Sequence, residues 1–361
     1  MVDQLAQLDA PEAATSAQQP DPLAGAYDQV RAEAEGRHVT MPLPWIRLSI
    51  LTRMLHPGTV AVIGGPLGQG KSYLALQILK TVAEAGYRCS YLPLEESRDH
   101  HVRRLAAVVD GSFTAVEPGD RARRVLDRHR AVLERLAPCI KQNPFQPERR
   151  GHRIVLFRPG WKDVLTWVRH RLTTDRVVVV DPLAQIEFGS WQRQSDFVQE
   201  AVAMAAESGN NLILVAHTIK SANPDRLRVA DLQGSADLVR LVQSILLLQA
   251  HDFRKGIIWR RGGEHDQVIY NRTVMIAKAR HGRGADQSVA FTFGPQSPRF
   301  EEQGVLDLDD DEIEPDGREG EDALSEGTPQ QDCQAAQPAS PVVDTAASSA
   351  QAEPAASGTF A

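Results

Sequence analysis

The stretch that decides the fold reads Gly65-Pro66-Leu67-Gly68-Gln69-Gly70-Lys71-Ser72. It matches the spacing G-x-x-x-x-G-K-S of a phosphate-binding loop. An apolar run from Thr59 to Ile63 precedes it, and a pattern typical of a helix follows it from Tyr73 to Ala85. A strand, a glycine-rich turn and a helix in this order place backbone N–H groups and the positive end of a helix dipole around an anion. The stretch therefore predicts a site for the phosphates of a nucleotide.

Two side chains of this loop have predicted roles. Lys71 is expected to contact the β- and γ-phosphates of ATP, and the Ser72 hydroxyl is expected to bind Mg²⁺. No motif that reads the base stands out, so these residues alone leave the choice between ATP and other nucleotides open. The alternative, a glycine-rich turn that matches by chance, conflicts with the strand and the helix on either side.

The chain divides into a central domain between two acidic ends. Residues 1–40 and 301–361 lack a sustained apolar period, and we expect both to be disordered apart from a possible short linker helix at 23–36. Residues 41–300 alternate apolar, strand-like runs with helical stretches, which is typical of a single α/β domain.

The strand-like runs are apolar throughout rather than alternating, as in Val177 to Val180. Strands buried on both faces have this composition, which is typical of parallel sheets covered by helices. The predicted fold is a three-layer α/β domain of the P-loop NTPase class with a largely parallel central sheet. The expected strands lie at 59–63, 87–93, 153–157, 176–181, 211–216, 244–249, 273–278 and 288–293. The expected helices lie at 72–85, 97–109, 120–136, 161–173 and 194–208.

Charge is distributed unevenly along the 361 residues, although the formal net charge is only −7. Residues 301–361 carry 16 acidic residues and one basic residue, Arg318, whereas residues 41–300 have a net charge of +13. A basic body suits an anionic ligand or partner, but charge alone fits a solvated basic surface equally well.

Composition also indicates a compartment. No run approaches the ~18 apolar residues of a membrane span, and the first residues lack the basic-then-apolar order of a signal peptide. The three cysteines, Cys89, Cys139 and Cys333, lie far apart and show neither zinc nor disulfide spacing. We therefore expect a cytoplasmic protein without a membrane partner.

Three strand-like runs end in ionisable residues. Asp181 ends the valine run and is expected to hold Mg²⁺ through water, with an ordinary strand-end or helix-capping aspartate as the alternative. Of Glu95 and Glu96, we favour Glu95 as the base that polarises the attacking water, against the alternative of an acid that begins the next helix. His217 suits a sensor of the γ-phosphate, although a single histidine at a strand end is often structural.

Lys278 and Arg280 alternate at the end of the expected strand 273–278, so both are expected to point the same way. Glycines beyond them let the chain turn sharply. Such a pair can reach the nucleotide of a neighbouring subunit, where an arginine supplied in trans is worth about 10³–10⁵ in rate. The alternative is a basic surface turn.

The order of these pieces resembles the RecA-like ATPase domain of DnaB-type hexameric helicases, and within that family the phage primase-helicase and RepA-like branch. The similarity covers roughly residues 40–300. The first 40 residues are too few for an amino-terminal collar or primase domain, so we expect the chain to lack both. The matching segments are Pro57–Gly65, Tyr91–Ser97, Asp181–Leu183, Ala216–Lys220, Asp231–Leu238 and Lys278–Gly282.

The resemblance implies ATP hydrolysis with Mg²⁺ by a hexameric ring that acts on single-stranded DNA in DNA replication. It implies that Glu95 is the catalytic glutamate, that His217 is the sensor, and that Lys278 and Arg280 act in trans. It also implies a loop after the sensor strand that lines the ring's channel and grips DNA. In this chain the candidate residues of that loop are Lys220, Arg226, Arg228, Gln233, Gly234 and Ser235.

A second interpretation is a KaiC-like regulatory ATPase, whose ring acts on a protein partner without unwinding DNA. Gln233, which stands where the helicase family usually has arginine, and the missing accessory domain favour this interpretation. DNA-stimulated ATP hydrolysis distinguishes the two.

Overall fold

A computed structural model of the protein describes residues 23–35, 39–145, 149–150, 153–154, 158–219, 227–234, 236–259 and 265–307. The expected disorder of residues 1–22 and 308–361 lies outside the described residues. So do three of the candidate DNA-contacting residues, Lys220, Arg226 and Ser235.

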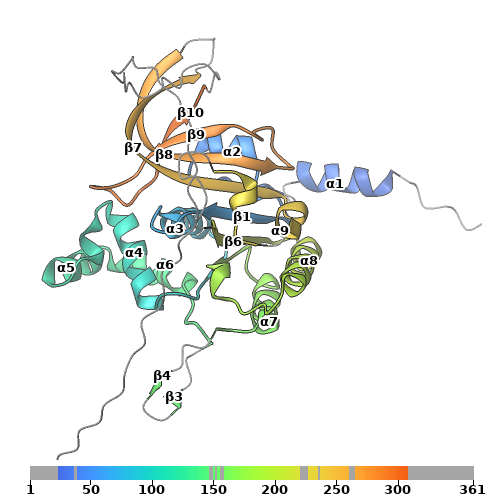
Figure 1. The fold of residues 1–361 in the computed structure, drawn as a ribbon, viewed down its shortest axis with the longest axis horizontal. Helices are drawn as coiled ribbons and strands as arrows, with labels where there is room; N and C mark the ends of the chain where they lie inside the picture. The colour runs from blue at the N-terminus through green and yellow to red at the C-terminus, as the bar shows by residue number, and fades with distance from the viewer. Residues whose placement is uncertain are drawn as a thin grey trace, which may run out of the picture. The chain divides into compact units, whose positions relative to one another are not determined.

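Within the described residues, the central sheet has eight strands in the order β10-β9-β8-β7-β1-β6-β5-β2 (Figure 1). Five strands at one side run parallel, and three at the other side are antiparallel. The predicted α/β fold with a largely parallel central sheet is therefore confirmed. The parallel strands are β1 (Val60–Gly65), β2 (Cys89–Pro93), β5 (Val177–Asp181), β6 (Asn211–His217) and β7 (Ser244–Trp259). The antiparallel strands are β8 (His265–Ala279), β9 (Ser288–Thr292) and β10 (Glu301–Val305).

Helices cover both faces of this sheet and create two separate cores. Along β5, Val177 and Val179 pack into one core, while Val178 and Val180 pack into the other. This period of two explains why the run is apolar throughout, since both faces are buried. The first core includes residues of α2 (Ile46–Thr52), α3 (Lys71–Glu84), α4 (Arg98–Asp110), α5 (Asp120–Arg128) and α6 (Arg130–Leu136). The second includes residues of α7 (Trp161–Leu172), α8 (Trp191–Ser208) and α9 (Ala236–Leu241).

One further helix, α1 (Ala24–Ala34), matches the short helix expected at 23–36. Leu23, just before it, and Tyr27 and Val30 within it are exposed and recur at helical spacing. Among the described helices, none combines the length and the apolar character that a membrane span requires.

Three expected elements differ in the structure. The predicted helix 120–136 is two helices, α5 and α6, because His129 between them leaves the helical conformation and bonds to Asp110. The predicted strand 153–157 does not join the central sheet in its described part. Instead, β4 (Arg153–Ile154) pairs with β3 (Arg149–Arg150) in a separate hairpin. The outer edge of β2 is already bonded by the segment at Ile140, through the bridge to Tyr91.

The folded domain also extends past the predicted boundary at residue 300. Strand β10 pairs with β9, and the backbone hydrogen bonds continue to Asp307. The Glu302 carboxylate accepts hydrogen bonds from the backbone N–H groups of Arg47 and Leu48, both at 3.0 Å. These are N–H groups in the first turn of α2, which have no partner within the helix itself. A residue of the predicted tail therefore caps a helix near the start of the domain.

We predict that Glu302→Ala destabilises the protein, because two helix N–H groups lose a charged acceptor. The expected loss in the free energy of unfolding is about 1–3 kcal/mol, measured by urea denaturation of the full chain. Glu301→Ala is the matched control, since Glu301 is exposed and lies in the same strand. Equal stability of the two variants would show that the cap contributes nothing.

Candidate nucleotide-binding site

The predicted phosphate loop lies between β1 and α3, and its backbone can form an anion cradle. Gly68 and Gly70 have φ values of +75° and +101°, which side chains other than glycine rarely adopt. At Gly70, a Cβ atom would also lie 3.0 Å from Phe300 and 3.2 Å from Phe293. The N-cap of α3 has no side-chain hydrogen bond, so its first N–H groups remain available to an anion.

Lys71 is buried at the base of this loop. Its Nζ donates to the carbonyl oxygens of Gly65, at 2.8 Å, and Pro66, at 2.6 Å. Burial lowers the pKa of Lys71 to about 8, although the negative charges of Asp181 and Glu95 act in the opposite direction. Negative phosphates placed beside Nζ would favour the protonated form and complete the charge balance.

The two predicted Mg²⁺ ligands, Ser72 and Asp181, lie together. Asp181 ends β5, and its carboxylate accepts hydrogen bonds from the hydroxyls of Ser72 and Tyr91. Burial raises the pKa of the Asp181 carboxyl, while these hydrogen bonds and the charge of Lys71 oppose the rise. In the described part of the chain, no group of three or more His, Cys, Asp or Glu side chains forms a metal cage. Mg²⁺ needs no such cage, since it uses one or two protein ligands with phosphate oxygens and water, and this pair fits it.

The structure distinguishes the adjacent carboxylates Glu95 and Glu96. Glu96 forms an ion pair with Arg104, with a further hydrogen bond of 3.0 Å, and lies near His100 and His101. Glu95 has a half-exposed side chain, and its Oε2 lies 4.0 Å from Nε2 of His217. Since Arg104 already neutralises Glu96, Glu95 is the better placed of the two to accept a proton from water.

The cluster around Glu96 was missed in the sequence. Arg104 also lies over the ring of Tyr73, 5.6 Å from its centroid. His101 is 3% exposed, and its pKa is lowered to about 3, mainly by burial and by the charge of Arg104. A signal was available: Glu96, His100 and Arg104 follow one another at intervals of four, which places them on one face of a helix.

His217 ends β6, directly beside Gly65 of the phosphate loop in the strand register. Burial and the charge of Lys71 lower its pKa to about 4. The imidazole is therefore neutral at pH 7, and any sensing of phosphate must proceed through hydrogen bonds rather than through a positive charge.

These side chains meet in one cavity of about 370 Å³. It lies at the carboxyl ends of parallel strands, the usual position of ligands in open α/β sheets. The predicted residues that line it are Gly68, Gly70, Lys71, Ser72, Glu95, Asp181 and His217, together with Leu67. Two further predicted loop residues contribute by their backbones: Gly65 and Pro66 provide the carbonyls that hold Lys71. Gln69 lies within the same turn, where its carbonyl accepts a bond from Arg272.

Lys278 and Arg280 are not among the described residues that line this cavity. Lys278 Nζ donates to the carbonyls of Val239 and Arg240, at 2.7 and 2.8 Å, and Arg280 donates to the carbonyl of Arg240 at 2.7 Å. The two side chains do point the same way, and within one chain they neutralise the carboxyl end of α9.

The described candidates for DNA contact lie in the segment that follows β6. Arg228 and Gln233 are exposed, and the Gln233 N–H donates to the carbonyl of His217 at 2.8 Å. Gly234 lies next to α8, since an added Cβ atom there would be 3.5 Å from Nε2 of Gln194. The structure thus connects this segment directly to the sensor position.

A phosphate loop, a strand-end aspartate and a parallel sheet of this order define a P-loop ATPase of the RecA-like class. The family model described as "AAA domain" matches residues 27–223, and the chain belongs to that family. A search of curated protein sequences found no match.

Solved structures show the same fold. The chain is similar to a helicase ATPase domain solved on its own, with a TM-score of 0.57 and 17% identity, over 78% of this chain and 99% of that one. It is also similar to a DnaB-like replicative helicase described with its interactions with primase, with a TM-score of 0.59 and 17% identity, over 83% of this chain and 69% of that one. The predicted resemblance is confirmed, and the chain has the fold of helicase-type ATPase domains.

We predict that nucleotide affinity falls as the pH rises above about 8. Lys71 loses its proton in this range, whereas an exposed lysine keeps it until about pH 10. Phosphates stabilise only the protonated form, so the Kd for MgATP should rise by up to about tenfold per pH unit above 8. Binding of a fluorescent ATP analogue between about pH 7 and 9.5 measures this rise.

The control is Lys71→Arg, which remains charged throughout this range and should show a weaker but nearly pH-independent affinity. An equal Kd for the unsubstituted protein at both ends of the range would contradict the lowered pKa of Lys71.

Proposed function

We propose that this protein is an ATP-hydrolysing motor of the DnaB-like type, which works as a hexameric ring on single-stranded DNA during DNA replication. One observation carries the proposal: Lys71, Ser72, Glu95, Asp181 and His217 line a single cavity beside a phosphate-binding loop. Hydrolysis of a nucleoside triphosphate requires these roles together: a phosphate-binding lysine, a metal site, a base and a sensor.

In the proposed mechanism, the loop N–H groups and Lys71 bind the phosphates, and Ser72 and Asp181 hold the metal. Bound Mg²⁺ supplies positive charge to the phosphate oxygens. Glu95 accepts the proton of the attacking water, and neutral His217 forms a hydrogen bond that depends on the γ-phosphate. Tyr91 positions Asp181 by donating its hydroxyl proton to the carboxylate.

The proposal includes a ring because the cavity needs a further cation for the transition state. Among the described residues that line it, Lys71 serves the phosphates of the bound nucleotide and Arg104 is paired with Glu96. In this scheme Lys278 and Arg280 serve the neighbouring subunit's nucleotide, and release from the carbonyls of α9 would free them to reach it. The exposed Leu23, Tyr27 and Val30 at α1 give each copy an apolar stripe that can pack on the next one.

Single-stranded DNA is the proposed partner because the segment after His217 combines donors with positive charge. Arg228, Gln233 and Gly234 lie in this segment, together with Lys220, Arg226 and Ser235 outside the described residues. Residues 41–300 carry a net charge of +13, which favours a polyanion. The free thiols of Cys89 and Cys139, 3.3 Å apart, are compatible with the reducing cytoplasm as the proposed location.

A KaiC-like regulatory ATPase remains the second candidate, favoured by one observation. Gln233 is exposed and uncharged at a position that is central to the segment after His217. An amide contacts DNA phosphates less strongly than a guanidinium, which suits a ring whose partner is a protein.

ATP turnover is predicted to rise when single-stranded DNA is added, at low salt more than at moderate salt, because phosphate contacts release counterions. Steady-state hydrolysis with and without an oligonucleotide measures this. Absence of both binding and stimulation at low salt would exclude the DNA motor and favour the regulatory ATPase.

The same assay identifies the base. Glu95→Gln should lower turnover by about 10²–10⁴-fold while MgATP still binds. Glu96→Gln is the matched comparison and should retain turnover, since the partner of Glu96 is Arg104. The reverse result would assign the base to Glu96.

Mixed rings test whether the site is shared between subunits. Arg280→Ala and Lys71→Ala should each abolish hydrolysis, because one removes the cation given to a neighbour and the other removes the phosphate-binding lysine. A mixture should regain part of the activity, since some interfaces combine an intact loop with an intact Arg280. If mixtures remain inactive while each variant still assembles, the site is completed within one chain.

A further inference from the structure

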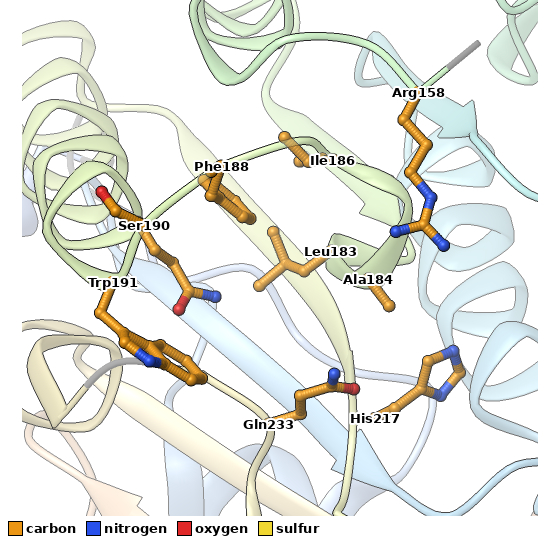
Figure 2. A pocket seen from close by; sticks show the side chains of 11 residues that line it. Arg158, Leu183, Ala184, Ile186, Phe188, Ser190, Trp191, His217 and Gln233 are labelled. Carbon is orange, nitrogen blue, oxygen red and sulfur yellow. The ribbon is translucent and has the colours of Figure 1, made fainter.

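A second pocket of about 420 Å³ lies next to the nucleotide cavity, and His217 lines both. It is formed by the segment that follows β5, by the start of α8, and by Gln233 (Figure 2). No role in ATP hydrolysis assigned above uses this pocket apart from His217.

The walls of the pocket are apolar, and its rim is aromatic. Leu183, Ile186 and Phe188 lie between Trp191 and Arg158, which Figure 2 shows on opposite sides of the pocket. Trp191 is 67% exposed, an unusual position for so large an apolar surface. Its ring is therefore available to stack against a flat ligand.

The pocket also contains buried polar atoms without partners. Gln194 is only 7% exposed, yet its Oε1 has no hydrogen-bond partner among the described residues. Nδ1 of His217 is in the same situation. Buried polar atoms are normally paired, so an amide and an imidazole left unpaired at one pocket indicate a ligand with hydrogen-bonding groups.

The chemistry of the lining defines the ligand. Among the described lining residues, Arg158 is the one permanent cation, and there is no carboxylate. A flat heteroaromatic ring with hydrogen-bonding edges fits between Trp191 and Phe188, with its edge toward the carboxamides of Gln194 and Gln233. A nucleobase has this chemistry, and base stacking on aromatic side chains is a common mode of single-strand binding.

We propose that this pocket receives one unstacked base of a bound DNA strand, and that His217 communicates its presence to the nucleotide cavity. The inference rests on the proposed DNA-motor function. A strand is favoured over a free nucleoside because Gln233 belongs to the same segment as the exposed Arg228, and Arg158 stands at the pocket to bind a backbone phosphate. On the other side, Nε2 of His217 lies 4.0 Å from Oε2 of Glu95, so a shift of the ring reaches the proposed base.

The test compares an oligothymidylate with an oligomer of the same length that carries abasic residues, using the full chain with a non-hydrolysable ATP analogue. The protein should bind the base-containing strand about tenfold more tightly or better. Trp191→Ala and Gln194→Met should each remove most of this preference, whereas Trp191→Phe should keep it. Gln192→Met is the matched control, since Gln192 lies on the same helix and bonds to Asp196 instead.

Equal affinity for the two strands, or an unchanged preference in Trp191→Ala, would overturn the base pocket and leave the DNA motor standing on backbone contacts. Failure to bind either strand would remove the proposed function itself. Thymidine alone should compete weakly, because it lacks the backbone. Competition by thymidine at the affinity of the strand would overturn the strand as the source of the base.

ATP turnover tests the role of His217. The abasic strand, at saturating concentration, should stimulate hydrolysis less than the base-containing strand, because the pocket beside His217 remains unfilled. Equal stimulation by both strands would overturn the coupling through His217.

Discussion

Burial of the parallel strands on both faces is the constraint on which the rest of the structure depends. Alternate valines of β5 pack into two different cores, so no position within the strand tolerates an unpaired charge. Charged side chains can follow a strand only where it ends. Because β1, β2, β5 and β6 run parallel, their carboxyl ends meet at one edge. The phosphate loop, Glu95, Asp181 and His217 therefore gather there, although they lie far apart along the chain.

Burial also sets the electrostatic character of the site. It lowers the pKa values of Lys71 and His217 and raises that of Asp181, so it disfavours the charged form of each group. Neighbouring opposite charges compensate only in part for Lys71 and Asp181. A triphosphate with its metal brings the missing charges, negative beside Lys71 and positive beside Asp181. The arrangement is thus suited to a highly charged ligand, and Arg104 keeps the adjacent Glu96 neutralised within the same cavity.

Sequence patterns predicted the elements whose signals are local. The phosphate loop and the apolar strands could be recognised because spacing and period determine them directly. Strand β10 was missed: Glu301 to Val305 reads as the start of an acidic tail, and only its pairing with β9 and the cap on α2 make it part of the domain. The run 153–157 shows the opposite error, since its composition suits a strand but the edge of β2 is bonded elsewhere. The roles of the individual site residues stay predictions.

By itself, the sequence determined that a nucleotide phosphate loop lies at the end of a buried strand, and that Asp181, Glu95 and His217 end strands as well. These features are local, and they follow from residue type and short-range spacing. Only the tertiary structure decided that Arg104 engages Glu96 rather than Glu95, that Lys278 and Arg280 bond to the end of α9, and that His217 separates two pockets. Such contacts join residues far apart in the chain, and their partners are selected by the packing of helices against the sheet, which no local pattern specifies.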